Sequence, residues 1–130
     1  MISKTDRQGG FVALITAIIL SAILLIITTT LNQTSFFTRS NLLDSEYKER
    51  SAGLAEACID IARLKLANDP RYSGSEPSIP IGTNSCEIRP IVGNTIETKA
   101  VYNSAVTNLR VVINPADISV VSWEEVSSFP

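Results

Sequence analysis

Residues 11–31 read FVALITAIILSAILLIITTTL, and the interpretation of the rest of the chain starts from this stretch. It carries no charged side chain, and the next charge along the chain is Arg39. A helix of these residues is roughly 31 Å long at 1.5 Å per residue, which matches a bilayer core of about 30 Å. Thr16 and Ser21 interrupt the apolar run, but a hydroxyl within a helix can bond back to the backbone at little cost. We therefore expect a membrane-spanning helix.

The polar leader, residues 1–10, gives this helix an orientation. Lys4 and Arg7 lie on its N-terminal side, and positively charged flanks tend to stay in the cytoplasm. We expect a single-pass cell-membrane protein with a cytoplasmic N-terminus and the remaining chain on the outer side. The junction Gly10-Phe11, where the leader meets the helix without a break, suggests a specific cut. Two alternatives remain open: a secretory signal peptide, although the run is long and a small-x-small site is lacking, and a plain uncleaved anchor.

The helical pattern continues beyond the apolar run. No proline occurs between Phe11 and Asp69, and Asn68-Asp69-Pro70 is a stop signal. Apolar side chains recur at spacings of three, four and seven, which predicts an amphipathic second half; they are Leu43, Tyr47, Leu54, Cys58, Ile61 and Ala62. We predict one helix over residues 11–69, with a soft joint at residues 28–35, where TTTLNQTS has modest helix propensity.

Residues 70–130 have the character of a sheet. Alternating apolar residues and turn signals predict about four antiparallel strands, at 85–92, 95–103, 106–113 and 118–126, with an optional short edge strand at 78–81. Pro90 fits only an edge or a bulge. Trp123 is expected in the core at strand spacing, with a binding platform as the alternative. The apolar face of the sheet needs a cover, and residues 42–66 of the helix are the candidate. The predicted fold class is therefore α+β, a long N-terminal helix packed against a C-terminal antiparallel sheet.

The two cysteines fit this arrangement. Cys58 lies on the helix and Cys86 begins the first main strand, so a disulfide between them would join helix to sheet. Closing a loop of about 29 residues is worth roughly 3.5 kcal/mol in the chain-entropy model. Two free buried thiols are the alternative. A metal site is disfavoured because two cysteines and no histidine offer too few ligands.

Small side chains follow one stripe of the apolar helix. Ala13, Ala17 and Ser21 are spaced by four residues, and this small-xxx-small pattern lets helices approach closely. The pattern favours helix–helix packing in an assembly. The alternative is that alanine and serine are simply common in membrane helices.

Gly10-Phe11, the charge-free helix, its amphipathic continuation and the antiparallel sheet together resemble the type IV pilins and type II secretion pseudopilins. The motif covers residues 7–31, and the architecture covers the whole chain. The resemblance implies that a prepilin peptidase cuts after Gly10 and that Phe11 is then N-methylated. It also implies partners: prepilin peptidase, other pilin subunits, an inner-membrane assembly platform, and membrane lipid before assembly. The mature subunit would be extracytoplasmic or extracellular, in a filament.

One position departs from the family pattern. The family usually carries a glutamate at the fifth mature residue, and here that residue is Ile15. That glutamate is thought to meet the terminal amine of a neighbouring subunit within the membrane, where a charge requires a partner. Without it, this chain should dock poorly behind an identical subunit. The resemblance therefore implies a minor or tip-like pilin rather than the abundant shaft subunit.

Enzyme and nucleic-acid functions are not expected. The chain has no histidine, no phosphate-binding glycine loop and no nucleophile elbow, so we expect no catalytic, cofactor or metal site. Glu124 and Glu125 are adjacent strand residues that point to opposite faces. Arg89, Lys99 and Arg110 could line one sheet face, but a net charge of -2 makes nucleic acid an unlikely partner. The competing class is an uncleaved, signal-anchored extracytoplasmic binding domain that does not polymerise.

Overall fold

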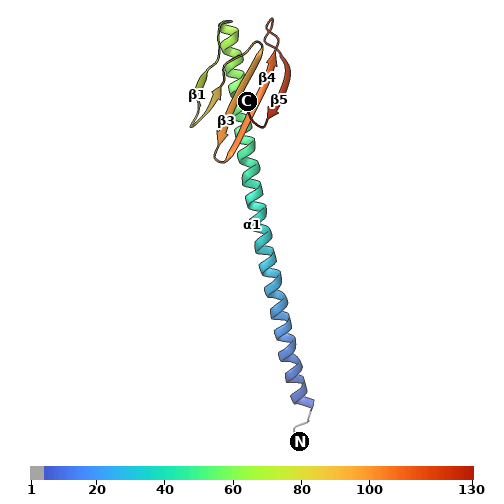
Figure 1. Cartoon of the computed structure of the whole chain (residues 1–130). Coiled ribbons are helices and arrows are strands. Elements are labelled where there is room, and N and C mark those ends of the chain that lie inside the picture. The colour runs from blue at the N-terminus through green and yellow to red at the C-terminus, as the bar shows by residue number, and fades with distance from the viewer. Residues whose placement is uncertain (1–4) are drawn as a thin grey trace. The chain divides into compact units, whose positions relative to one another are not determined.

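The computed structural model describes residues 5–130, so the part of the leader before Thr5, including Lys4, lies outside the described residues. The described residues fall into two parts, one that ends at Asn41 and one that runs over Leu42–Pro130. One helix, α1, runs over Thr5–Asn68 (Figure 1). It begins six residues before the predicted start and passes through Gly10-Phe11 without a break. It ends one residue before the predicted end, where Pro70 prevents continuation.

The hydroxyl side chains of the apolar helix are satisfied within the helix itself. Thr16 donates a hydrogen bond to the carbonyl of Val12 at 2.7 Å, and Ser21 donates one to the carbonyl of Ala17 at 2.8 Å. This is the back-bonding expected of hydroxyl residues in a helix interior. The helix is also continuous through residues 28–35, as predicted, whereas the softness of that segment stays a prediction.

The second part contains a five-stranded antiparallel sheet in the order β1-β2-β3-β4-β5. The strands are β1 Glu76–Ile81, β2 Asn84–Ile88, β3 Thr95–Tyr102, β4 Ala105–Ile113 and β5 Val120–Val126. The predicted α+β class is confirmed, and the count is five rather than about four, because the optional edge strand is a full member. Pro90 belongs to neither an edge strand nor a bulge, since β2 ends at Ile88 and proline cannot donate to the ladder.

The core lies between one face of the sheet and the helix after Leu42, as predicted for residues 42–66. It is made of small and aliphatic side chains from both layers: Ala55, Cys58, Ile59, Ala62, Ile79, Cys86, Ile88, Ile96, Ala100, Leu109, Val111 and Ile113. Cys58 and Cys86 form the predicted disulfide, with their Cα atoms 6.2 Å apart, within the usual range for a bridge. The helix contributes Ala55, Cys58, Ile59 and Ala62 to this core.

A polar cluster accompanies this core at the N-terminal end of the covering helix segment. The hydroxyls of Ser51 and Thr107, both fully buried, are hydrogen-bonded at 2.7 Å. The Lys48 ammonium donates to the carbonyl of Val106 at 2.8 Å and pairs with the Glu125 carboxylate. Each buried polar group therefore has a partner, which avoids the cost of an unsatisfied one.

Trp123 is not in the core, contrary to its prediction. Its side chain is 44% exposed. The register pairs Trp123 with Val111, a fully buried residue, so Trp123 does point to the helix-facing side as the alternation predicts. However, β5 is the edge strand, and burial also depends on how far the covering helix extends sideways over the sheet.

Candidate functional site

The surface of α1 before Leu42 is the first candidate site. Every residue over 9–41 is exposed, and most large side chains among them are apolar; Phe11 is 65% exposed and Leu14 60%. By length and composition the helix can cross a membrane, a test that a signal sequence near an N-terminus also passes. An apolar helix with no described cover needs lipid or other helices around it.

The Gly9-Gly10 pair lies inside this helix, although nothing in the described structure requires glycine there. A Cβ atom added at either position meets no atom within 4 Å, and neither residue has a positive φ. Glycine inside a helix is less stable than alanine by roughly 1 kcal/mol, because it loses more backbone freedom on folding. The two glycines therefore weaken the helix at the junction with Phe11 without improving the packing of this chain.

The predicted packing stripe is present on the helix surface. Ala13, Ala17 and Ser21 are all exposed, and the Ser21 hydroxyl is already bonded to the Ala17 carbonyl at 2.8 Å. The stripe therefore offers close approach between helices rather than a free hydroxyl donor. Ile15 is 41% exposed and presents an aliphatic side chain on this surface.

The threonine run at the end of the apolar stretch makes side-chain hydrogen bonds to the helix backbone. Each hydroxyl donates to the carbonyls three and four residues before it: Thr28 at 3.0 and 2.9 Å, Thr29 at 2.9 and 3.0 Å, and Thr30 at 2.9 and 3.0 Å. Three β-branched residues in succession lower helix propensity. Their hydroxyls partly offset this by adding local hydrogen bonds, although such back-bonding can also bend a helix.

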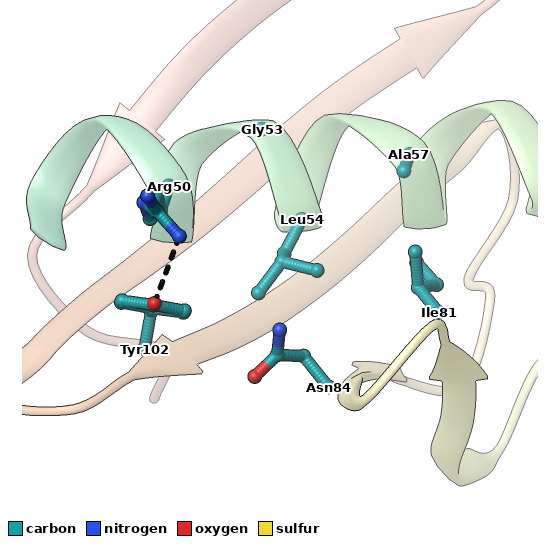
Figure 2. A pocket seen from close by; sticks show the side chains of 7 residues that line it. All are labelled: Arg50, Gly53, Leu54, Ala57, Ile81, Asn84 and Tyr102. Carbon is teal, nitrogen blue, oxygen red and sulfur yellow. Dashed lines mark hydrogen bonds between the residues drawn. The ribbon is translucent and has the colours of Figure 1, made fainter. Parts of the chain in front are cut away.

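A shallow groove of about 260 Å³ lies in the second part, between α1 and the ends of three strands. Figure 2 shows Arg50 pointing toward Tyr102 at one end and apolar side chains along its middle; its lining is Arg50, Gly53, Leu54, Ala57, Ile81, Asn84 and Tyr102. The guanidinium donates to the Tyr102 hydroxyl at 3.0 Å and to the Glu46 carboxylate at 2.7 Å. Tyr102 and then Glu46 raise the pKa of Arg50, so its cation is already engaged.

The outer face of the sheet carries a row of ion pairs. Arg89, Lys99 and Arg110 share this face, but Glu97 accepts from Arg89 at 3.2 Å and from Arg110 at 2.9 Å. Arg110 also donates to Glu124 at 3.1 Å, and its pKa is raised by Glu97 first and Glu124 second. Two of the three cations expected to form a basic stripe are therefore neutralised within the sheet.

Glu124 and Glu125 are adjacent residues of β5 whose carboxylates make separate ion pairs. Glu125 pairs with Lys48 on the helix side while Glu124 pairs with Arg110 on the outer side, so the adjacent carboxylates point apart as predicted. Sequence periodicity did not single out Lys48, because a lysine at the border of an amphipathic face resembles any solvated lysine. Within residues 5–130 no three metal-ligating side chains gather in one place.

Comparison of the chain with protein-family models, with curated proteins and with solved structures finds no match. The features that bear on function are therefore those of the chain itself: the exposed apolar helix, the glycine junction in front of Phe11, and the disulfide-linked sheet that follows them in the same polypeptide.

Proposed function

We propose that this chain is a structural subunit of a type IV pilus or a related pseudopilus. In this proposal a prepilin peptidase cuts between Gly10 and Phe11, the new terminus is N-methylated, and subunits assemble through their N-terminal helices. The fold supports the proposal, because a long helix with an apolar first half is joined to a small antiparallel sheet that covers its second half. Before assembly the helix would lie in the cell membrane, with the sheet on the outer side.

The observation that carries the proposal is the glycine junction. Gly9 and Gly10 have open space around them and ordinary helical φ values, so the fold gains nothing from their lack of a side chain. Glycine lets another molecule approach the backbone closely, which fits recognition of this junction by another protein. A peptidase that binds the backbone next to Phe11 would make such a close approach.

The place of the subunit follows from Ile15. Its aliphatic side chain is 41% exposed on a helix surface that neighbouring subunits would contact, and it cannot pair with a terminal amine. A neighbouring subunit's buried amine would then lack its partner, which is costly in an apolar setting. We therefore place the chain as a minor or tip-like subunit, whose partners are other pilins and the assembly platform.

Mass spectrometry of the native protein tests the processing step. We expect a chain that begins at N-methylated Phe11. Gly10→Val should retain the leader, whereas Gly9→Val, a matched change at an equally open helical position, should still be processed. An intact Met1 in the native protein would instead support the uncleaved membrane-anchored domain.

The composition of purified filaments tests the minor role separately. Quantitative mass spectrometry should find this chain as a small fraction of the filament subunits. A filament made mainly of this chain would contradict the role inferred from Ile15, while leaving processing at Gly10 intact.

A further inference from the structure

The two edges of the sheet differ in how open they are. The β1 edge contains Pro77 and Pro80, and its pairing with β2 is irregular between Glu76 and Ile79. Proline removes backbone donors and irregular pairing interrupts the ladder, so this edge is poorly suited to accept another strand. The β5 edge contains no proline, and its register with β4 is regular over residues 122–126.

The backbone of β5 directs hydrogen-bonding groups away from the sheet. The N–H of Ile113 bonds toward β3, to the carbonyl of Asn94, and the N–H of Asn114 bonds toward the β5 side, to the carbonyl of Ser119. Because the direction alternates along an antiparallel strand, even-numbered residues of β4 bond to β5. Their register partners are residues 122, 124 and 126, which leaves the N–H and C=O groups of Trp123 and Glu125 on the free edge.

The charges on β5 do not protect this edge. Glu124 pairs with Arg110 on the outer face, and Glu125 pairs with Lys48 on the helix side. Free charges on an edge strand are a common defence against pairing with another chain. Both carboxylates of β5 are compensated within the chain, so an approaching strand meets little net charge and an uncharged segment fits best.

The apolar side chains of β5 are also uncovered. Val121 is 67% exposed and Trp123 is 44% exposed. The residues after β5 do not run along its edge: the Ser127 carbonyl accepts from Asn108, and the Phe129 ring lies 4.6 Å from the guanidinium of Arg89. Both partners belong to the outer face, so the C-terminal residues contact that face instead of pairing with the edge.

We propose that β5 binds an extended, uncharged segment of another protein, which adds to the sheet as a sixth strand. Regularly spaced backbone donors and acceptors are what an extended chain satisfies, and side-chain contacts then give specificity. The segment would bond to the backbone of Trp123 and Glu125 and place an apolar side chain against the Trp123 ring. This inference does not depend on processing at Gly10.

Trp123 is the only tryptophan of the chain, so its fluorescence reports this edge directly. The probe is an uncharged, acetylated and amidated hexapeptide of alternating threonine and valine, added to the full chain in detergent micelles. We expect Trp123 emission to shift to shorter wavelength with saturation. The same peptide with every backbone nitrogen methylated, which cannot donate from either edge, should produce no shift.

Two matched variants locate the binding. Val121→Lys adds an uncompensated charge to the edge strand and should weaken binding by on the order of tenfold. Val101→Lys adds the same charge at a 47% exposed position of the central strand β3 and should bind like the wild type. Absence of a shift, equal binding of the N-methylated peptide, or equal loss in both variants would overturn the proposal. A concentration-dependent dimer that Val121→Lys disrupts, without any peptide effect, would overturn it in favour of a second copy of the chain.

Discussion

Loss of the Cys58–Cys86 disulfide should strongly destabilise the second part of the chain. The two cysteines are 28 residues apart, and both are buried between α1 and the sheet. Opening a loop of this size restores conformational entropy to the unfolded chain worth about 3.5 kcal/mol in the chain-entropy model. For a folded part of this size, that lowers the melting temperature by roughly 15–25 °C.

The assay compares oxidised and reduced wild-type chains in the same micelles, with unfolding followed by far-ultraviolet circular dichroism and by Trp123 fluorescence. Reduction keeps both sulfur atoms in the core and so isolates the effect of the cross-link. The melting temperature of the double variant Cys58→Ala/Cys86→Ala should fall at least as far as that of the reduced chain, because the variant also loses buried side-chain volume. Melting temperatures of the oxidised and reduced chains within about 3 °C of each other would refute the chain-entropy reasoning, since such a gap is below 1 kcal/mol.

Two further changes test local features of the sheet region. Gly74→Ala should destabilise the chain more than Gly82→Ala, because both positions have positive φ but only the Gly74 Cβ meets the backbone carbonyl of Arg89; equal melting temperatures for the two variants would contradict this contact. The Lys65 ammonium lowers the pKa of Glu76, so the ion pair stabilises the fold above the unfolded pKa of Glu76 and is lost as pH falls through the folded one. Glu76→Gln should therefore melt below the wild type at pH 7, and this gap should narrow as pH falls below the ordinary glutamate pKa of about 4.3; a gap that stays constant through this acid range would rule the ion pair out as its cause.

The helix and the strand faces are predictable because their periodicity is local. Absence of proline up to Pro70 predicts a helix that the structure ends at Asn68. Alternation along β3 and β4 predicts which side chains face the helix, and Ile96 and Val111 are indeed fully buried. The same local reasoning places Trp123 on the correct face of β5.

What local patterns cannot supply is the lateral position of one layer on another. Trp123 is exposed because it lies on an edge strand, and no periodicity within β5 contains that information. Lys48 illustrates the converse, since it lies at the helix border and gains its partners from strands more than fifty residues away. Glu97 neutralises two arginines that sequence alone groups as a basic stripe, because cross-strand register decides which charges meet.

The glycine junction differs from these cases, because it can be recognised from residues that are adjacent in the sequence. Gly10-Phe11 in front of an apolar run is visible in the sequence, and the structure adds that Gly10 has no packing role among the described residues. The compensated charges of the β5 edge, by contrast, could not be found from the sequence. They depend on two ion pairs with residues of other elements.

The hydrogen bonds that the threonine hydroxyls make to the backbone change how much of the α1 surface is apolar. With the hydroxyls of Thr28, Thr29 and Thr30 turned to backbone carbonyls, the groups left to face outward are their methyls. A surrounding acyl chain would therefore meet hydrocarbon beyond Ile27 and on to Leu31, although residue-by-residue hydropathy scores the threonines as polar. The threonines therefore belong to the apolar surface of the helix over residues 11–31 and do not interrupt it.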